Sequence, residues 1–198
     1  MSPEPLMPDL EQRARDLIAE IGEAFADVPY PGDDRIGLFP DDHDSIMLAL
    51  DFRGKHWREI TVREIVDGRH REDLLFMTAE AFAFYLPAYL LACIVDPREA
   101  DLALDSVVQF LTKPEGEDPY WTTFFEERVR ALNWKQRAGV RHFLEYIADR
   151  DAETDFVVEG VQRALIYWRQ VTTNGSSGDT MNDSGGSRGE GGKGCGGG

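Results

Sequence analysis

Apolar residues recur every three or four positions through most of residues 9–171, which is the spacing of helices that bury one face. Asp9 and Gln12 have the spacing of a capping box, so a first helix is predicted to begin at Asp9 and to end before Pro29. Residues 29–34 are rich in proline, glycine and aspartate and are predicted to form a loop. The apolar positions of this first helix are Leu10, Ala14, Leu17, Ile18, Ile21, Phe25 and Val28.

The same reasoning predicts helices along the rest of the chain. The apolar run 74–77 is predicted to be extended, and Thr78 to cap the helix that follows. We find no internal repeat and no hairpin pattern, so the predicted fold class is all-α, with one short strand pair at most. The other predicted helices cover residues 44–52, closed by Gly54; a short segment capped by Thr61 and Glu64 and stopped by Gly68; residues 100–111 and 122–132; a segment opened by Asn133 with Gln136; and residues 154–171.

Residues 81–95 read AFAFYLPAYLLACIV and contain no charged side chain. Crossing a bilayer takes about 20 apolar residues, and this run is shorter, is bounded by Glu80 and Asp96 and has Pro87 near its middle. It therefore predicts a central helix buried on nearly all sides. A kink is expected at Pro87, because proline lacks the N–H and crowds the preceding turn.

The end of the chain has a different composition. Residues 172–198 hold eleven of the nineteen glycines and no aromatic residue. Such a segment buries too little surface to offset the entropy of ordering its backbone. The sequence thus predicts a compact single domain over residues 9–171 and a disordered glycine-rich tail over residues 172–198.

Charge narrows the range of partners. The chain has 21 Lys and Arg against 37 Asp and Glu, a net charge of −16. This charge repels phosphate backbones, so nucleic acid and anionic membranes are disfavoured, whereas a basic protein or a cation is accommodated. Cys93 and Cys195 are too differently placed to form a structural disulfide, and the first residues lack the basic and apolar regions of a secretory signal, so a cytoplasmic protein is expected.

The densest polar cluster is the run Asp41, Asp42, His43 and Asp44, with His56 twelve positions beyond Asp44, and the candidate metal ligands in it are Asp41, His43, Asp44 and His56. Carboxylates and imidazoles are ligands for Zn²⁺, Mn²⁺ or Fe²⁺. Consecutive loop residues point in different directions, however, and no HExxH motif supplies a rigid second half. The simpler interpretation is a solvated loop in which Asp44 caps a helix.

Three further features are weighed in the same way. His70 and Asp73 have the residue types of a general acid and base, but a surface turn with local ion pairs is the favoured interpretation. Cys93 lies among apolar residues and is interpreted as a core thiol. We find no glycine-rich phosphate loop, so no cofactor is predicted.

Aromatic residues with a polar edge often anchor partners, and we take Trp57, Tyr89 and Trp121 as candidate interaction residues. A core role is also predicted for Tyr89, because it follows helical spacing among aliphatic residues. A core role is less strongly indicated for Trp121, since it lies beside Pro119 at a predicted loop.

Three segments resemble an uncharacterised bacterial family, number 6714 of the domain-of-unknown-function series. They are residues 53–60, with Gly54 and Trp57, residues 75–82, and residues 85–90, which read YLPAYL. The resemblance covers about residues 10–170 and carries no known activity. Some relatives have a histidine and cysteines before the tryptophan segment, where this chain has only His43. Further matching positions are Gln136, Phe143, Leu144, Ala164, Leu165, Tyr167 and Trp168.

Two functional hypotheses remain. The first is a non-enzymatic protein-interaction or regulatory module that uses an acidic helical face or a groove near Trp57 and Tyr89. The alternative is a small metal-assisted hydrolase that uses His43, His56 and nearby aspartates.

Overall fold

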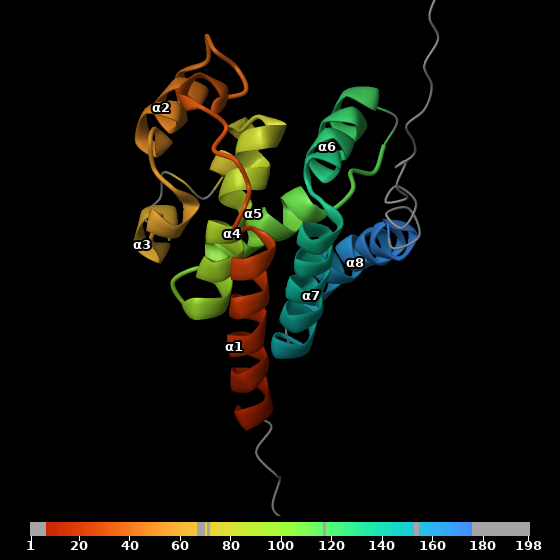
Figure 1. The fold of residues 1–198 in the computed structure, drawn as a ribbon. Helices are drawn as coiled ribbons and strands as arrows, with labels where there is room; N and C mark the ends of the chain where they lie inside the picture. The colour runs from red at the N-terminus through yellow and green to blue at the C-terminus, as the bar shows by residue number, and fades with distance from the viewer. Residues whose placement is uncertain (1–6, 67–69, 71, 117, 153–154, 176–198) are drawn as a thin grey trace, which may run out of the picture.

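The computed structural model describes residues 7–66, 70, 72–116, 118–152 and 155–175 (Figure 1). These ranges form eight α-helices and three short 3-10 helices, and their one β-type pairing is an isolated bridge between Gly37 and Met77. The predicted all-α fold class is confirmed. In chain order the elements are α1 (Met7–Ala24), η1 (Asp33–Arg35), α2 (His43–Phe52), η2 (Trp57–Glu59), α3 (Val62–Val66), η3 (Asp73–Phe76), α4 (Ala79–Val95), α5 (Asp101–Leu111), α6 (Pro119–Ala131), α7 (Trp134–Arg150) and α8 (Asp155–Gly175).

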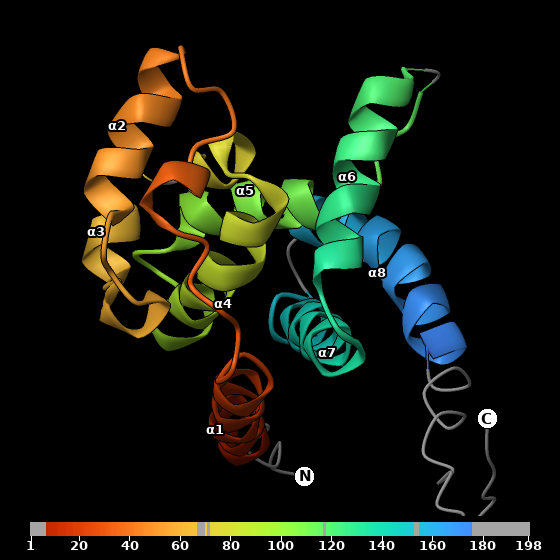
Figure 2. The same ribbon diagram turned by 45° about the horizontal axis from the view of Figure 1, so that its top comes forward.

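Helix α4 lies in the middle of the molecule, with α2 and α3 on one side and α6, α7 and α8 on the other in both views (Figures 1 and 2). Thirteen of its seventeen residues are buried, and α1, α3, α5, α6 and η2 pack against it. The helix continues through Pro87. The predicted buried central helix is therefore confirmed. Within the described ranges, no helix combines the length and the apolar character needed to cross a bilayer.

Two tyrosine hydroxyls of α4 bond to backbone outside the helix. The hydroxyl of Tyr85 donates to the carbonyl of Phe52 at 2.9 Å, and that of Tyr89 donates to the carbonyl of His70 at 2.9 Å. Burial raises the pKa of both phenols, so they remain protonated donors at neutral pH. Through these bonds α4 fixes the end of α2 and the segment before η3.

The predicted helix caps form at three places where the capping residues lie within a few positions of each other in the sequence. Thr78 accepts from the N–H of Ala81 at 3.1 Å and opens α4. Asn133 and Gln136 each accept from the other's backbone N–H, at 3.0 and 2.8 Å, and open α7. Thr61 and Glu64 form the same kind of box before α3. Gly68, the predicted stop of that helix, lies outside the described residues.

The structure corrects other boundaries. Helix α1 begins at Met7 and ends at Ala24, so Asp9 lies in its first turn and is not the cap. The cap of α2 is Asp42 instead of Asp44, because Asp42 accepts from the N–H of Ser45 at 2.9 Å. Helix α8 continues to Gly175, so residues 172–175 of the predicted tail are helical. Residues 176–198 lie outside the described ranges.

The prediction that the run 74–77 is extended is wrong. Residues 73–76 form the 3-10 helix η3. Its carbonyls turn toward Arg128 of α6, which follows it in the chain by more than fifty residues. The turn is thus stabilised by a distant donor that a local pattern does not contain.

Gly37 allows a close approach between the loop after η1 and helix α2. A Cβ added there would lie 2.6 Å from the carbonyl oxygen of Ser45. Gly22, inside α1, has open space around the same position. We therefore expect Gly37→Ala to lower the free energy of unfolding by about 1–3 kcal/mol. Gly22→Ala should raise it by about 0.5–1 kcal/mol, because alanine favours helix over glycine.

Urea denaturation of the two variants beside the parent protein measures both changes. Equal effects of the two substitutions, in sign and size, would show that the contact with Ser45 imposes no constraint on the fold.

Candidate functional site

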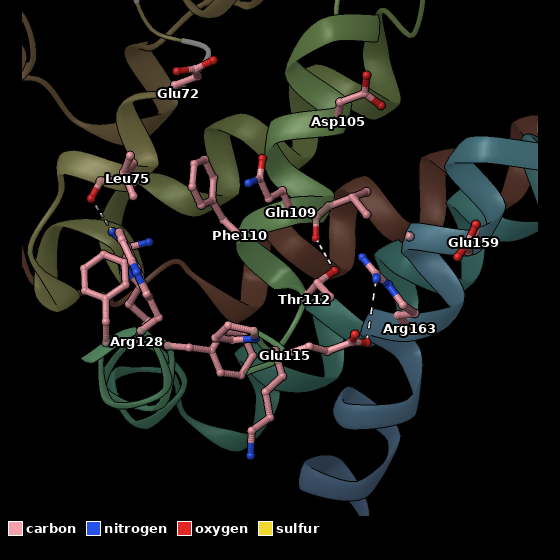
Figure 3. A pocket seen from close by; sticks show the side chains of 17 residues that line it. Glu72, Leu75, Asp105, Gln109, Phe110, Thr112, Glu115, Arg128, Glu159 and Arg163 are labelled. Carbon is pink, nitrogen blue, oxygen red and sulfur yellow. Dashed lines mark hydrogen bonds and ion pairs between the residues drawn. The ribbon is translucent and has the colours of Figure 1, made fainter. Parts of the chain in front are cut away.

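A cleft of about 970 Å³ lies between α5, α6, α8 and η3 (Figure 3). It forms because α6 packs chiefly on α4, whereas α5 packs on both α4 and α8. Its volume is at the upper end of the range usual for ligand pockets, about 300–1,000 Å³. The lining residues are Glu72, Leu75, Asp105, Val108, Gln109, Phe110, Thr112, Lys113, Pro114, Glu115, Trp121, Phe124, Phe125, Arg128, Glu159, Gly160 and Arg163.

Apolar contacts hold the walls of the cleft together. The ring of Phe125 meets the ring of Tyr167 on α8 edge to face, with centroids 5.0 Å apart. A Cβ added at Gly160 would lie 3.2 Å from the side chain of Val108, so the absence of a side chain lets α8 come close to α5. The indole N–H of buried Trp168 donates to the carbonyl of Leu111 at 2.7 Å. The position of α8 against the end of α5 is therefore well determined.

An aromatic lip is defined here as Trp121 and Phe124, which line the cleft, together with Tyr120, whose ring contacts both. Trp121 meets both other rings edge to face, at 5.1 and 5.7 Å between centroids. Asp118 caps α6 by accepting from the N–H of Tyr120, and Pro119 occupies its first turn. The end of α6 that carries these rings projects from the other helices (Figures 1 and 2). Tyr120 is 50% exposed and Trp121 45% exposed.

Arg128 lies next to Phe124 in the wall of the cleft and is buried, with only 3% of its surface exposed. Its Nη2 donates to the carbonyls of Leu74, Leu75 and Met77, the last two at 3.2 and 3.1 Å. The rings of Phe124 and Phe82 lie 3.9 and 4.7 Å from its Cζ. Burial lowers the pKa of Arg128 to about 9, which leaves the guanidinium charged at neutral pH.

The other two cationic side chains of the cleft form ion pairs with carboxylates. Arg163 pairs with Glu115 at 3.7 Å, and Lys113 pairs with Glu126 at 3.8 Å. Glu72, Asp105 and Glu159 have no cationic partner among the residues that the structure describes. We call these three side chains the rim carboxylates. Desolvation, and then the charge of Asp101, raise the pKa of Asp105, as expected for a carboxylate that lacks a nearby cation.

Comparison with protein families matches residues 13–172 to a family of unknown function, DUF6714. The chain belongs to this family. The match spans the whole of the cleft lining, so the cleft is part of the DUF6714 domain. Comparisons with curated proteins and with solved structures gave no match.

The three predicted interaction residues fall in different places in the DUF6714 domain. Trp121 lines the cleft and presents its ring to solvent. Trp57 and Tyr89 are 2% and 0% exposed and pack inside the core. Sequence reasoning did not select Phe124 or Arg128. The spacing of Trp121, Phe124 and Phe125 on one predicted helix was an available signal, but nothing local marks Arg128 as buried.

The candidate metal ligands of the DUF6714 domain are not brought together. His43 and Asp44 lie in the first turn of α2, and Asp41 precedes it. His56 instead caps η2, where its Nδ1 accepts from the N–H of Arg58 at 3.1 Å. Among the described residues, no group of three or more His, Cys, Asp and Glu side chains is placed to hold a metal ion.

The pair of His70 and Asp73 is mostly buried, which corrects the prediction of a surface turn. His70 Nδ1 bonds to Asp73, and its Nε2 lies 3.7 Å from a carboxylate oxygen of Asp51. The hydroxyl of Tyr89 fixes the backbone of His70 from inside. Cys93 is a buried core thiol, as predicted, and burial raises its pKa to about 12.

The cleft wall at Arg128 generates a stability prediction. Arg128→Met keeps an unbranched apolar side chain beside Phe82 and Phe124 but removes the donor to three carbonyls. We expect a loss of about 3 kcal/mol in the free energy of unfolding, because buried acceptors are left unpaired. The matched control is Arg130→Met on the same helix, where the side chain is exposed. That substitution should change stability by no more than about 0.5 kcal/mol.

Chemical denaturation followed by circular dichroism gives both values. Similar small losses for the two variants would mean that the η3 carbonyls find other partners and that Arg128 does not hold this wall.

Proposed function

We propose that the DUF6714 domain is a non-enzymatic protein-interaction or regulatory module, and that the cleft between α5, α6 and α8 receives a segment of a protein partner. The observation that carries this proposal is the aromatic lip. Trp121 lines the cleft and is 45% exposed, and the neighbouring ring of Tyr120 is 50% exposed, both on the projecting end of a helix.

Aromatic side chains are the residue types in which binding energy most often concentrates at protein interfaces. Isolated exposed rings are ordinary, but clustered rings beside a cavity mark surfaces that gain by being covered. Tyr120, Trp121 and Phe124 also support one another by ring contacts, so they are partly ordered before a partner arrives. Preordered contact residues lower the entropy cost of association.

The polar groups of the cleft favour a protein over a small molecule. Small-ligand sites place a few polar groups so that they converge inside an enclosed space. Here Glu72, Asp105 and Glu159 are exposed and lie on three separate elements around the opening (Figure 3). The one deeply buried charge, Arg128, is directed to backbone carbonyls.

The alternative of a metal-assisted hydrolase has less support. Within the described lining of the cleft there is neither His43 nor His56. The net charge of −16 disfavours polyanionic partners, and we propose a cytoplasmic protein as the partner.

A matched pair of tryptophans tests the proposal. Trp121 lies at the lip and Trp134 at the start of α7, outside the cleft lining, and they are 45% and 52% exposed. Tagged parent protein, Trp121→Ala and Trp134→Ala are used to capture proteins from a lysate of the native host, and the affinity of each recovered partner is then measured by calorimetry. We expect Trp121→Ala to weaken binding by about 2 kcal/mol, roughly thirtyfold, and Trp134→Ala to leave it unchanged.

Circular dichroism and a denaturation curve confirm that both variants are folded. The proposal is abandoned if every partner binds Trp121→Ala as tightly as the parent protein, or if the two substitutions weaken binding equally.

A further inference from the structure

The charges around the cleft define the chemistry of its occupant. Resting on the proposed function, we infer that the cleft binds a cationic protein segment, in which an apolar or aromatic residue enters between α6 and α8 and flanking Lys or Arg side chains meet the rim carboxylates. The proposal follows from which charges of the cleft are already engaged.

The two exposed cations of the cleft, Lys113 and Arg163, each have a carboxylate partner within the protein. Arg163 reaches Glu115, and Lys113 reaches Glu126 and lies 5.6 Å from the centroid of the Tyr167 ring. The guanidinium of Arg128 lies over the rings of Phe82 and Phe124, and its Nη2 donates to three carbonyls, whereas its buried Nε has no hydrogen-bond partner among the described residues. An anionic segment would compete with Glu115 for Arg163 and with Glu126 for Lys113, and it would be repelled by the rim carboxylates.

The rim carboxylates are in the opposite situation. Glu72 precedes η3, Asp105 lies on α5 and Glu159 on α8, and none has a cationic partner among the described residues. Figure 3 shows that the three side chains come from different parts of the lining. A segment crossing the cleft would meet a carboxylate on each side of its anchor. Asp105, whose pKa is raised in the free protein, would gain a counter-ion.

The aromatic lip suits the same occupant. Trp121 and Phe124 offer ring faces and edges to an apolar anchor, and the faces of aromatic rings also attract Lys and Arg. The arrangement of Arg128 over the Phe124 ring, at 3.9 Å, is such a contact within the protein. The net charge of −16 adds a long-range attraction for cations, which raises the rate of encounter at low salt.

Synthetic peptides of one design test the inference with the full chain. Three fluorescent peptides of about twelve residues share a central Leu-Trp anchor, flanked by Lys and Arg, by Ser and Gln, or by Glu. Dissociation constants come from fluorescence anisotropy at about 50 mM and 500 mM salt. We expect the basic peptide to bind at least about tenfold more tightly than the neutral one at low salt, to lose that advantage at high salt, and to bind Trp121→Ala poorly.

Two double variants with the same change in net charge provide the control. Asp105→Asn with Glu159→Gln removes two rim carboxylates, and we expect it to weaken the basic peptide by about fivefold. Glu23→Gln with Asp27→Asn neutralises two exposed carboxylates at and just beyond the end of α1, outside the cleft lining, and should leave the affinity unchanged.

Several results would overturn the inference. Equal affinities of the three peptides would show that charge does not select the occupant, and equal effects of the two double variants would assign the preference to net charge alone. Spermidine binding as tightly as the basic peptide would indicate a small-cation site. In any of these cases, a partner whose capture still requires Trp121 would leave the proposed function standing, whereas the loss of all dependence on Trp121 removes both.

Discussion

Helix α4 has no polar face to turn toward water, and this constraint organises the molecule. A helix that is apolar all round is stable in a water-soluble protein only if other elements cover every side of it. The chain meets this requirement with α1, α3, α5, α6 and η2, which come from before and after α4 in sequence. The tyrosines of α4 satisfy their hydroxyls on backbone carbonyls of Phe52 and His70, so its polar atoms fix neighbouring loops in place.

The cleft results from the way in which α6 and α8 pack around α4 and α5. Helix α6 covers α4 and is tied to it through Arg128, which gathers the carbonyls around η3 and lies over Phe82 of α4. Helix α8 is instead attached to the end of α5 by Trp168, and it also packs on α7. Helices α6 and α8 pack on different helices and contact each other through Phe125 and Tyr167. The cleft is the space left beside this contact.

Sequence patterns within a few residues predicted many of the helices and their caps. The remaining features depend on contacts between residues that are distant in sequence. The capping residues Thr78 and Asn133 and the uncharged run of α4 each carry their information within a few residues, so these features were predictable. The form of η3 was not, because the donor that collects its carbonyls is Arg128, on another helix. The candidate site followed the same rule. Trp121 was selected because a proline and a loop signal stand beside it. The burial of Trp57 and the burial of the His70–Asp73 pair were not predicted, because they depend on segments that the local pattern does not connect.

The residues of α6 that stabilise the fold and those proposed to bind a partner lie at different positions along the helix. Its inward residues, Phe125 and Arg128, are buried and hold the wall to α8, α4 and η3. Its outward residues, Tyr120 and Trp121, lie near the start of the helix, are about half exposed and contact mainly each other and Phe124. The Nη2 group of Arg128 donates to backbone carbonyls. The exposed rim carboxylates are therefore the main charged groups that an incoming segment would contact. Substitutions at the lip can therefore change what the cleft binds while the contacts that keep the cleft open stay intact.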